Sequence, residues 1–330
     1  MKMKATTGFI IVFLGLHSFL VSAQETVPIY SDYLSDNIYL VHPAAAGAGN
    51  CGKLRLTARS QWGGIDDAPT LQTLSTHIRV GDNADLGYHS GVGFILFNDK
   101  NGYHSQQGVV GTYAYHINLG SYEEAHQLSF GLSFMAVNNK VDESSFVIPD
   151  IVISGIVQSE SYFNSDVGMA YHNNGFFSYV TAKNILLSAR NLYGDKESFN
   201  LRRYLMTLGY YYGKGKNFQL EPSIMAQVIE RTGEKFVDFN IKMYKKVSNA
   251  QIWAAFSYRR GFDSATTEEL NYLTPIVGLN YQRFMVSYTY TKQTGEILFD
   301  DAGYHQISLG YNFGCRESLN WGWRNIDALF

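Results

Sequence analysis

Histidine, cysteine and basic side chains are the residues of this chain that could do chemistry, but their spacing matches no common catalytic or cofactor motif. The nine histidines are scattered, and the best pair is His77 with His89, which fall on neighbouring predicted strands. Two histidines do not complete a zinc site, and isolated polar histidines explain the same pattern. The sequence holds no HExxH, GxSxG, P-loop or dinucleotide-binding motif. We therefore predict a protein that is not an enzyme and that binds no metal or cofactor.

The composition favours β-structure. Of 330 residues, 45% are hydrophobic, 15% aromatic and only 17% charged, with 31 glycines and 6 prolines. Aromatic residues are enriched in strands, and so many of them argue against a disordered chain. Two cysteines are too few for a small disulfide-stapled domain. The formal net charge of -3 provides no basic field, so nucleic acid is not expected as a partner.

Residues 1–23 have the pattern of a secretory signal peptide. Lys2 and Lys4 precede an apolar stretch over 8–16, and Val21-Ser22-Ala23 comes next as a cleavage site. The apolar stretch is shorter than the ~20 residues that a membrane-spanning helix needs, which makes an uncleaved anchor the weaker alternative. We expect an exported protein whose mature chain begins at Gln24.

Apolar residues alternate with small or polar ones along most of the mature chain. Between 126 and 138, for example, Leu128, Phe130 and Leu132 alternate with Ser129, Gly131 and Ser133. The pattern predicts fourteen strands, at 53–61, 70–80, 86–98, 106–118, 126–138, 164–172, 175–183, 201–213, 216–229, 234–245, 250–260, 269–281, 283–293 and 303–313. Most of these lengths fit tilted strands that cross a bilayer. We predict an all-β fold, a transmembrane antiparallel β-barrel over 53–313; a secreted β-sandwich is the alternative, although sandwich strands usually span about 5 to 6 residues.

The connections between the predicted strands alternate in length. Those at 81–85, 119–125, 173–174, 214–215, 246–249 and 282 are short, whereas those at 139–163 and 184–200 are long. Outer-membrane barrels have short periplasmic turns and longer outer loops. This pattern places both ends of the barrel in the periplasm, with a plug or strap segment at 24–52 and a short tail at 314–330.

Charged residues on the first strand have to face the barrel interior. Lys53, Arg55 and Arg59 share one face, and a lipid-facing arginine costs several kcal/mol near the bilayer midplane. These charges could line a channel, anchor a plug or form an internal salt-bridge network. By the same reasoning Arg202 is expected at a rim of the barrel.

Cys51 and Cys315 lie just before the first and just after the last predicted strand. Closure of a barrel makes those strands neighbours, and the periplasm is oxidising. We predict a disulfide between Cys51 and Cys315 across the seam; two unrelated thiols are the alternative.

Several strings resemble the PorP/SprF family of type IX secretion membrane proteins from Bacteroidota. They include Pro28-Ile29-Tyr30-Ser31-Asp32-Tyr33, His42-Pro43-Ala44-Ala45-Ala46-Gly47, Arg59-Ser60-Gln61-Trp62 and Asn98-Asp99-Lys100. The chain departs from the family pattern at His42, where an asparagine is usual, and at Ala45, where an aromatic residue is usual. The strings supply the candidate partner-binding residues: Pro28, Tyr30, Tyr33, Pro43, Ala44, Gly47, Arg59, Gln61, Trp62, Asn98, Asp99 and Lys100.

The resemblance implies an outer-membrane barrel that works with the type IX secretion apparatus and anchors a secreted, gliding-adhesin-like surface protein. Expected partners are that protein's C-terminal sorting domain, other type IX secretion components and outer-membrane lipid. Loops 139–163 and 184–200 are the expected contact region. The alternative is a small-molecule channel resembling the fatty-acid porins. An outer-membrane lipase or protease would need a Ser/His/acid set, which we do not find in this sequence. A filled lumen favours the anchor, and an open pore favours the channel.

Overall fold

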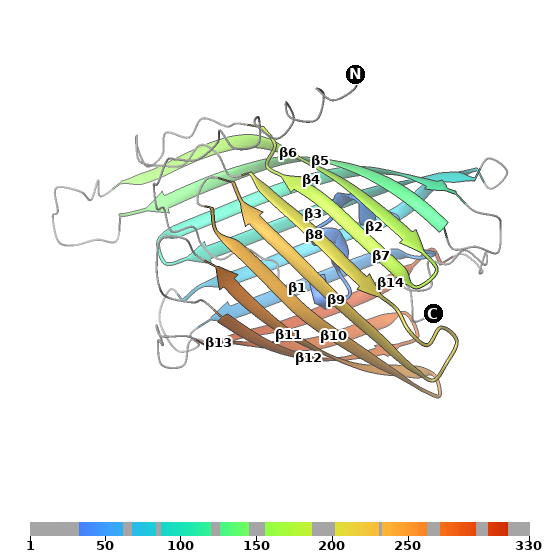
Figure 1. Ribbon diagram of the computed structural model, residues 1–330. Helices are drawn as coiled ribbons and strands as arrows, with labels where there is room; N and C mark the ends of the chain where they lie inside the picture. The colour runs from blue at the N-terminus through green and yellow to red at the C-terminus, as the bar shows by residue number, and fades with distance from the viewer. Residues whose placement is uncertain are drawn as a thin grey trace, which may run out of the picture.

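A computed structural model shows a closed barrel of antiparallel strands, each paired with its neighbours in sequence and the last with the first (Figure 1). The structure describes residues 33–61, 68–83, 87–119, 126–144, 156–186, 202–230, 233–262, 271–294 and 303–315. The predicted all-β barrel of fourteen strands is confirmed. No helix within these described ranges is long and apolar enough to cross a membrane.

The strands have the following bounds: β1 (Gly52–Gln61), β2 (Thr70–Asn83), β3 (Tyr88–Asn101), β4 (His104–Asn118), β5 (His126–Asp142), β6 (Val157–Asn173), β7 (Phe176–Lys183), β8 (Arg203–Tyr210), β9 (Phe218–Ile229), β10 (Lys235–Val247), β11 (Ala250–Phe262), β12 (Asn271–Tyr281), β13 (Phe284–Thr294) and β14 (Gly303–Phe313). The β5–β6 hairpin is longer than predicted, because its pairing continues to Asp142↔Val157. Residues 157–163 are mostly polar or small, so hydrophobic alternation does not reveal this extension.

The two faces of the wall differ in polarity. On β1, buried and exposed residues alternate, with Lys53 and Arg55 inward and Leu54 and Leu56 outward. The outward face of the other strands likewise carries large apolar side chains such as Phe134, which is 63% exposed. An apolar outside and a polar inside are the arrangement of a membrane barrel.

The two ends of the barrel differ in their connections. At one end the strands are joined by tight turns, three of which contain a non-glycine residue at positive φ: Asn174, Ser248 and Gln282. At the other end β5–β6 and β7–β8 are joined by long connections. We call these the short-turn end and the long-loop end. The alternation is not strict, because only Gly102 and Tyr103 join β3 to β4 at the long-loop end, where the left-handed φ of Gly102 permits a tight turn.

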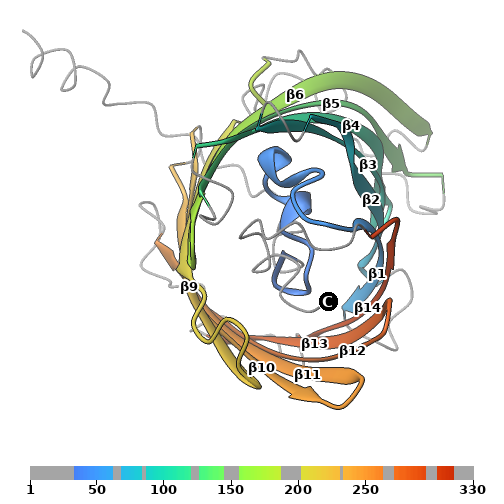
Figure 2. The same cartoon turned by 90° about the vertical axis from the view of Figure 1, so that its right-hand side faces the viewer.

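The segment 33–51 lies inside the ring of strands, as Figure 2 shows, and we call it the plug. It contains two single-turn 3-10 helices, η2 (Ile38–Leu40) and η3 (Pro43–Ala45). Its apolar side chains form one cluster with inward-facing residues of the wall, including Ala170 and Leu205. The core of this protein is therefore the interface between the plug and the wall.

The seam between β1 and β14 is continuous. The two strands pair in unbroken register from Gly52↔Phe313 to Gln61↔Tyr304. A disulfide joins Cys51 to Cys315 at the short-turn end, with the two Cα atoms 4.0 Å apart. This bond connects the end of the plug to the end of the last strand.

Candidate functional site: the plug in the lumen

Glycines in the wall allow the plug to approach it closely. A Cβ atom at Gly91 would overlap the carbonyl of Ala46, and one at Gly131 would overlap the peptide between Pro43 and Ala44. Missing Cβ atoms let two backbones come together. We call the wall glycines that meet the plug the glycine cradle: Gly91 and Gly93 on β3, Gly131 on β5 and Gly168 on β6.

Hydrogen bonds hold the same part of the plug in place. His116 Nε2 lies 2.9 Å from the carbonyl oxygen of Ala46, and the backbone N–H of Gly47 donates to His77 Nδ1 over 3.0 Å. The oxygen of Ala46 can only accept, so His116 donates from Nε2. Both contacts are to the plug backbone, which explains how they hold a stretch of small residues.

His42 belongs to the plug, and its side chain contacts two strands of the wall. Its Nδ1 lies 2.8 Å from Thr181 Oγ1 on β7 and its Nε2 lies 2.8 Å from Thr207 Oγ1 on β8. The ring stacks on Tyr179 with centroids 4.9 Å apart. Burial, with a smaller contribution from Lys183, lowers the pKa of His42 to about 3. The ring is therefore neutral at physiological pH, and one nitrogen donates while the other accepts.

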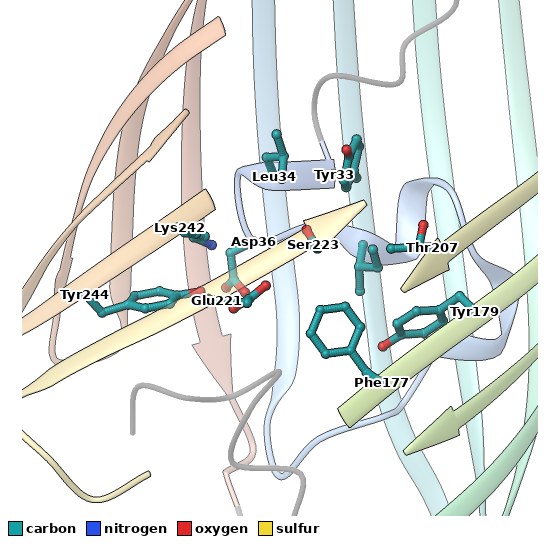
Figure 3. A pocket seen from close by; sticks show the side chains of 11 residues that line it. Tyr33, Leu34, Asp36, Phe177, Tyr179, Thr207, Glu221, Ser223, Lys242 and Tyr244 are labelled. Atoms are coloured by element: carbon teal, nitrogen blue, oxygen red, sulfur yellow. Dashed lines mark hydrogen bonds between the residues drawn. The ribbon is translucent and has the colours of Figure 1, made fainter. Parts of the chain in front are cut away.

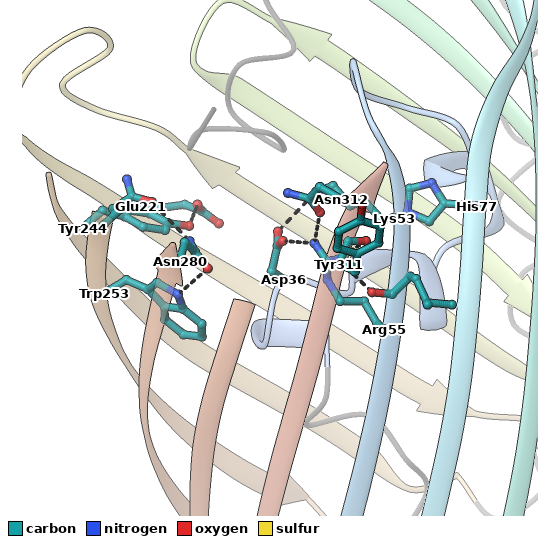
Figure 4. A network of polar contacts seen from close by, with 12 residues as sticks. Asp36, Lys53, Arg55, His77, Glu221, Tyr244, Trp253, Asn280, Tyr311 and Asn312 are labelled. Atoms are coloured by element: carbon teal, nitrogen blue, oxygen red, sulfur yellow. Dashed lines mark hydrogen bonds and ion pairs between the residues drawn. The ribbon is translucent and has the colours of Figure 1, made fainter. Parts of the chain in front are cut away.

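Asp36 connects the other part of the plug to the seam of the barrel. Its carboxylate accepts a hydrogen bond from Arg55 Nη2 at 2.6 Å and pairs with Lys53 Nζ at 3.4 Å. Arg55 Nη2 also donates to Asn312 on β14 at 2.9 Å (Figure 4). Burial alone would raise the pKa of Asp36, but Lys53, Arg55 and Lys242 outweigh it and hold the pKa well below its ordinary value. Two of the first-strand charges thus anchor the plug.

A second ion pair lies next to the start of the described plug. Arg259 donates hydrogen bonds to the carboxylate of Asp238 from Nε at 2.6 Å and from Nη2 at 2.8 Å. This is the bidentate geometry typical of an arginine–carboxylate pair. Tyr33 donates from its hydroxyl to the same carboxylate at 3.2 Å and accepts from Asn240 Nδ2 at 2.7 Å. These contacts fix the plug to β10, which Arg259 joins to β11.

A cavity of about 60 Å³ lies between the plug and strands β7 to β10 (Figure 3). Glu221 and Lys242 face it, and Tyr244 donates from its hydroxyl to Glu221 at 2.7 Å. Lys242 Nζ lies 4.3 Å from the ring centre of Trp253, at a distance that permits a cation–π interaction. The space is large enough for a few water molecules.

The predicted partner-binding residues fall into two groups. Tyr33, Pro43, Ala44 and Gly47 belong to the plug. The remaining described ones lie near the long-loop end: Arg59, Gln61, Asn98, Asp99 and Lys100. Within this second group, Asn98 accepts from Gln107 at 3.1 Å and Arg59 stacks on Tyr304. Pro28, Tyr30 and Trp62 lie outside the described residues, as do the predicted signal peptide and most of the predicted tail.

Arg202, which we expected at a rim, precedes β8 at the long-loop end. Its Nη1 pairs with Glu230 at 3.1 Å. This position is a rim position and agrees with the cost of a lipid-facing arginine.

Sequence reasoning missed the lumen residues on β9, β10 and β11. Glu221, Asp238, Lys242 and Arg259 each occupy an inward position of their strand. Their inward parity follows from strand alternation and would have marked them as lumen residues. Their contact with the plug, by contrast, leaves no local signal. Within the described part of the chain, no group of three or more His, Cys, Asp or Glu side chains could hold a metal ion.

Comparison with known protein families identifies the chain. The profile of the type IX secretion system membrane protein PorP/SprF family matches residues 22–311. This chain belongs to that family. The resemblance of the sequence strings is thereby confirmed, and the protein is an outer-membrane barrel of the type IX secretion system. The family is one of secretion-system membrane barrels and not of enzymes.

Solved structures with a similar shape are distant in sequence. The TodX monoaromatic hydrocarbon channel deltaS2 mutant is 10% identical with a TM-score of 0.47, over 85% of this chain and 94% of that one. A Pseudomonas aeruginosa FadL homologue is 8% identical with a TM-score of 0.47, over 83% and 93%. The Acinetobacter baumannii outer membrane protein Omp33 is 10% identical with a TM-score of 0.43, over 81% and 100%. No curated protein matches the chain in sequence.

Proposed function

We propose that this barrel anchors a secreted protein at the cell surface through that protein's C-terminal domain. The observation that carries the proposal is the plug, which is attached to the wall at β1, β3, β5, β7, β8 and β10. The two cavities described between plug and wall measure about 60 and 20 Å³. Among the described residues the plug is held on many sides of the wall, an arrangement that supports a binding protein more directly than an open channel.

Membership of the PorP/SprF family supports a role beside other type IX secretion components. In this proposal the long-loop end faces outward and contacts the partner. The connections between β5 and β6 and between β7 and β8 provide the longest stretches of chain at that end. The wall and plug then act as the base that holds these loops.

Affinity purification of the full-length barrel from its native outer membrane tests the proposal. We expect a large secreted protein with a type IX C-terminal domain to co-purify. A variant with residues 145–155 replaced by a glycine–serine linker should lose it. The matched control Lys214→Ser, in the turn between β8 and β9 at the opposite end, should retain it.

Two results would contradict the anchoring function. The first is that the wild type recovers no secreted protein. The second is that the purified barrel conducts small solutes steadily in a planar bilayer, which would favour the channel.

A further inference from the structure

A small pocket lies on the long-loop side of the plug. It measures about 20 Å³. Tyr33 and Leu34 of the plug line it, together with wall residues close to the ends of their strands, among them Arg59, Arg259, Tyr272 and Tyr304. We call it the arginine–tyrosine pocket.

The two arginines of this pocket differ in their partners. Arg259 is held by Asp238 through two hydrogen bonds, so its charge is balanced. Arg59 lies over the ring of Tyr304 at 5.4 Å and makes neither an ion pair nor a hydrogen bond through its guanidinium with any residue that the structure describes. The face of an aromatic ring accepts none of the five conventional N–H hydrogen bonds that a guanidinium can donate.

The acidic residues nearby form no ion pair with Arg59 in the described part of the chain. Asp238 is bound to Arg259 and Tyr33. Asp99 faces inward on β3, but Leu71 of β2 stands between Arg59 and Asp99 in the strand register. Of the charged side chains that line the pocket, Arg59 and Arg259 are positive and Asp238 is negative, while Asp99 interacts with Arg59 only through its charge from two strands away.

We propose that the arginine–tyrosine pocket binds a terminal carboxylate. Arginine binds carboxylates with two parallel hydrogen bonds, and the guanidinium carbon of Arg59 lies 5.4 Å from the ring centre of Tyr304. A pocket of about 20 Å³ has room for about one water-sized group. It therefore admits the end of a molecule and leaves the rest of that molecule outside, towards the long loops.

If the proposed anchoring function holds, this carboxylate is the C-terminus of the secreted partner, and this assignment rests on that function. The C-terminus of a polypeptide carries its carboxylate at the end of an extendable backbone, so it suits a pocket that admits only the end of a molecule. The other source of the same chemistry is a free small acid such as a fatty acid. The two sources carry different groups on the carboxylate, a peptide backbone or an alkyl chain, and can be separated by competition.

Binding of a labelled peptide to the full-length barrel in detergent micelles tests the proposal. The probe is fluorescein-labelled hexaalanine with a free C-terminal carboxylate, compared with the same peptide carrying a C-terminal amide. Hydrogen bonds to a charged carboxylate are stronger than those to a neutral amide. We therefore expect the peptide acid to bind at least about tenfold more tightly than the peptide amide. In Arg59→Gln this ratio should fall to within about twofold, and Arg59→Lys should give an intermediate ratio because it keeps the charge but not the fork.

The matched control is Arg202→Gln, which alters an arginine at the same end of the barrel that already pairs with Glu230. It should leave the acid-to-amide ratio unchanged. Equal binding of acid and amide by the wild type would overturn the proposal that the pocket binds a carboxylate. This result would hold whether or not a secreted partner co-purifies. Displacement of the peptide by decanoate at lower concentrations than by unlabelled hexaalanine would overturn the assignment to a chain end.

Discussion

Residues 43–47 and residues 33–36 of the plug contact different sectors of the wall, and the contacts differ in kind. Residues 43–47 sit in the glycine cradle, backbone against backbone. Residues 33–36 are held by charge, through Asp36 at the seam and Tyr33 at Asp238. Both described cavities border residues 33–36. One part of the plug is thus positioned by shape and the other by electrostatics, and we expect the second part to be the one that can move.

Removal of the Asp36 charge should produce the largest effect. Asp36→Asn keeps the shape of the side chain but removes the carboxylate that pairs with the buried Arg55 and Lys53. Loss of one member of a buried ion pair typically costs about 3–5 kcal/mol. We expect the free energy of unfolding in detergent micelles to fall by about this amount, with faster proteolysis at the start of the plug.

Asp142→Asn is the matched control, because Asp142 and Lys140 form an ion pair whose side chains are 36% and 44% exposed. Exposed pairs contribute less than about 1 kcal/mol. If both substitutions had the same small effect, residues 33–36 would not be held by charge.

A methyl group in the glycine cradle tests the other half of the comparison. Gly131→Ala places a Cβ where the Pro43–Ala44 peptide lies. Overpacking of this kind typically costs about 1–3 kcal/mol. We expect a loss in this range in the free energy of unfolding, accompanied by weaker hydrogen-exchange protection of residues 43–47.

The control for this substitution is Gly111→Ala on β4, where an added Cβ would meet nothing within 4 Å. It should change the free energy of unfolding by less than about 0.5 kcal/mol. Equal losses at the two positions would show that strand propensity, and not the plug, is responsible.

The smallest expected effect is a pH dependence at His42, which lies between the two halves. Its pKa is lowered to about 3, so the native state holds no proton there while the unfolded chain takes one up below about pH 6.5. The unfolded state then binds more protons, and stability falls as the pH drops. Between pH 6.5 and 4.5 His42→Gln should flatten this fall by about 1 kcal/mol per pH unit.

His305→Gln serves as the reference, because His305 is exposed on the outer face and contacts Tyr288. Its unfolding curve should keep the slope of the wild type. An unchanged slope in His42→Gln would mean that the ring is not neutral in the folded protein.

Much of the wall could be predicted from the sequence. The strand count and the neighbours follow from a period of two that persists over segments long enough to cross a bilayer, and the inward direction of Lys53 and Arg55 follows from the cost of charge in lipid. The predicted strand bounds are wrong where hydrophobic alternation is weak. The β5–β6 hairpin continues through residues 157–163, which are mostly polar or small, and Gly102 turns the chain tightly where a longer loop was expected.

The lumen could be predicted only in outline. The pattern of the first strand left open whether its charges line a channel, anchor a plug or pair with one another. Their anchoring of the plug depends on Asp36, which lies outside the strands and has no periodic pattern. The glycines of β3 carry no sequence pattern that indicates what they contact, and the structure shows that they seat the plug.

The β-barrel, its two faces and its family can be inferred from the sequence alone. Successive residues of a strand face lipid and lumen in turn, so apolar and polar residues alternate along the chain. The filling of the lumen depends on the tertiary structure. A polar inward face looks the same in sequence whether it meets water or protein. The partners that settle the question, such as Asp36 with Arg55 and His42 with Thr207, are joined by closure of the barrel around the plug and not by any spacing along the chain.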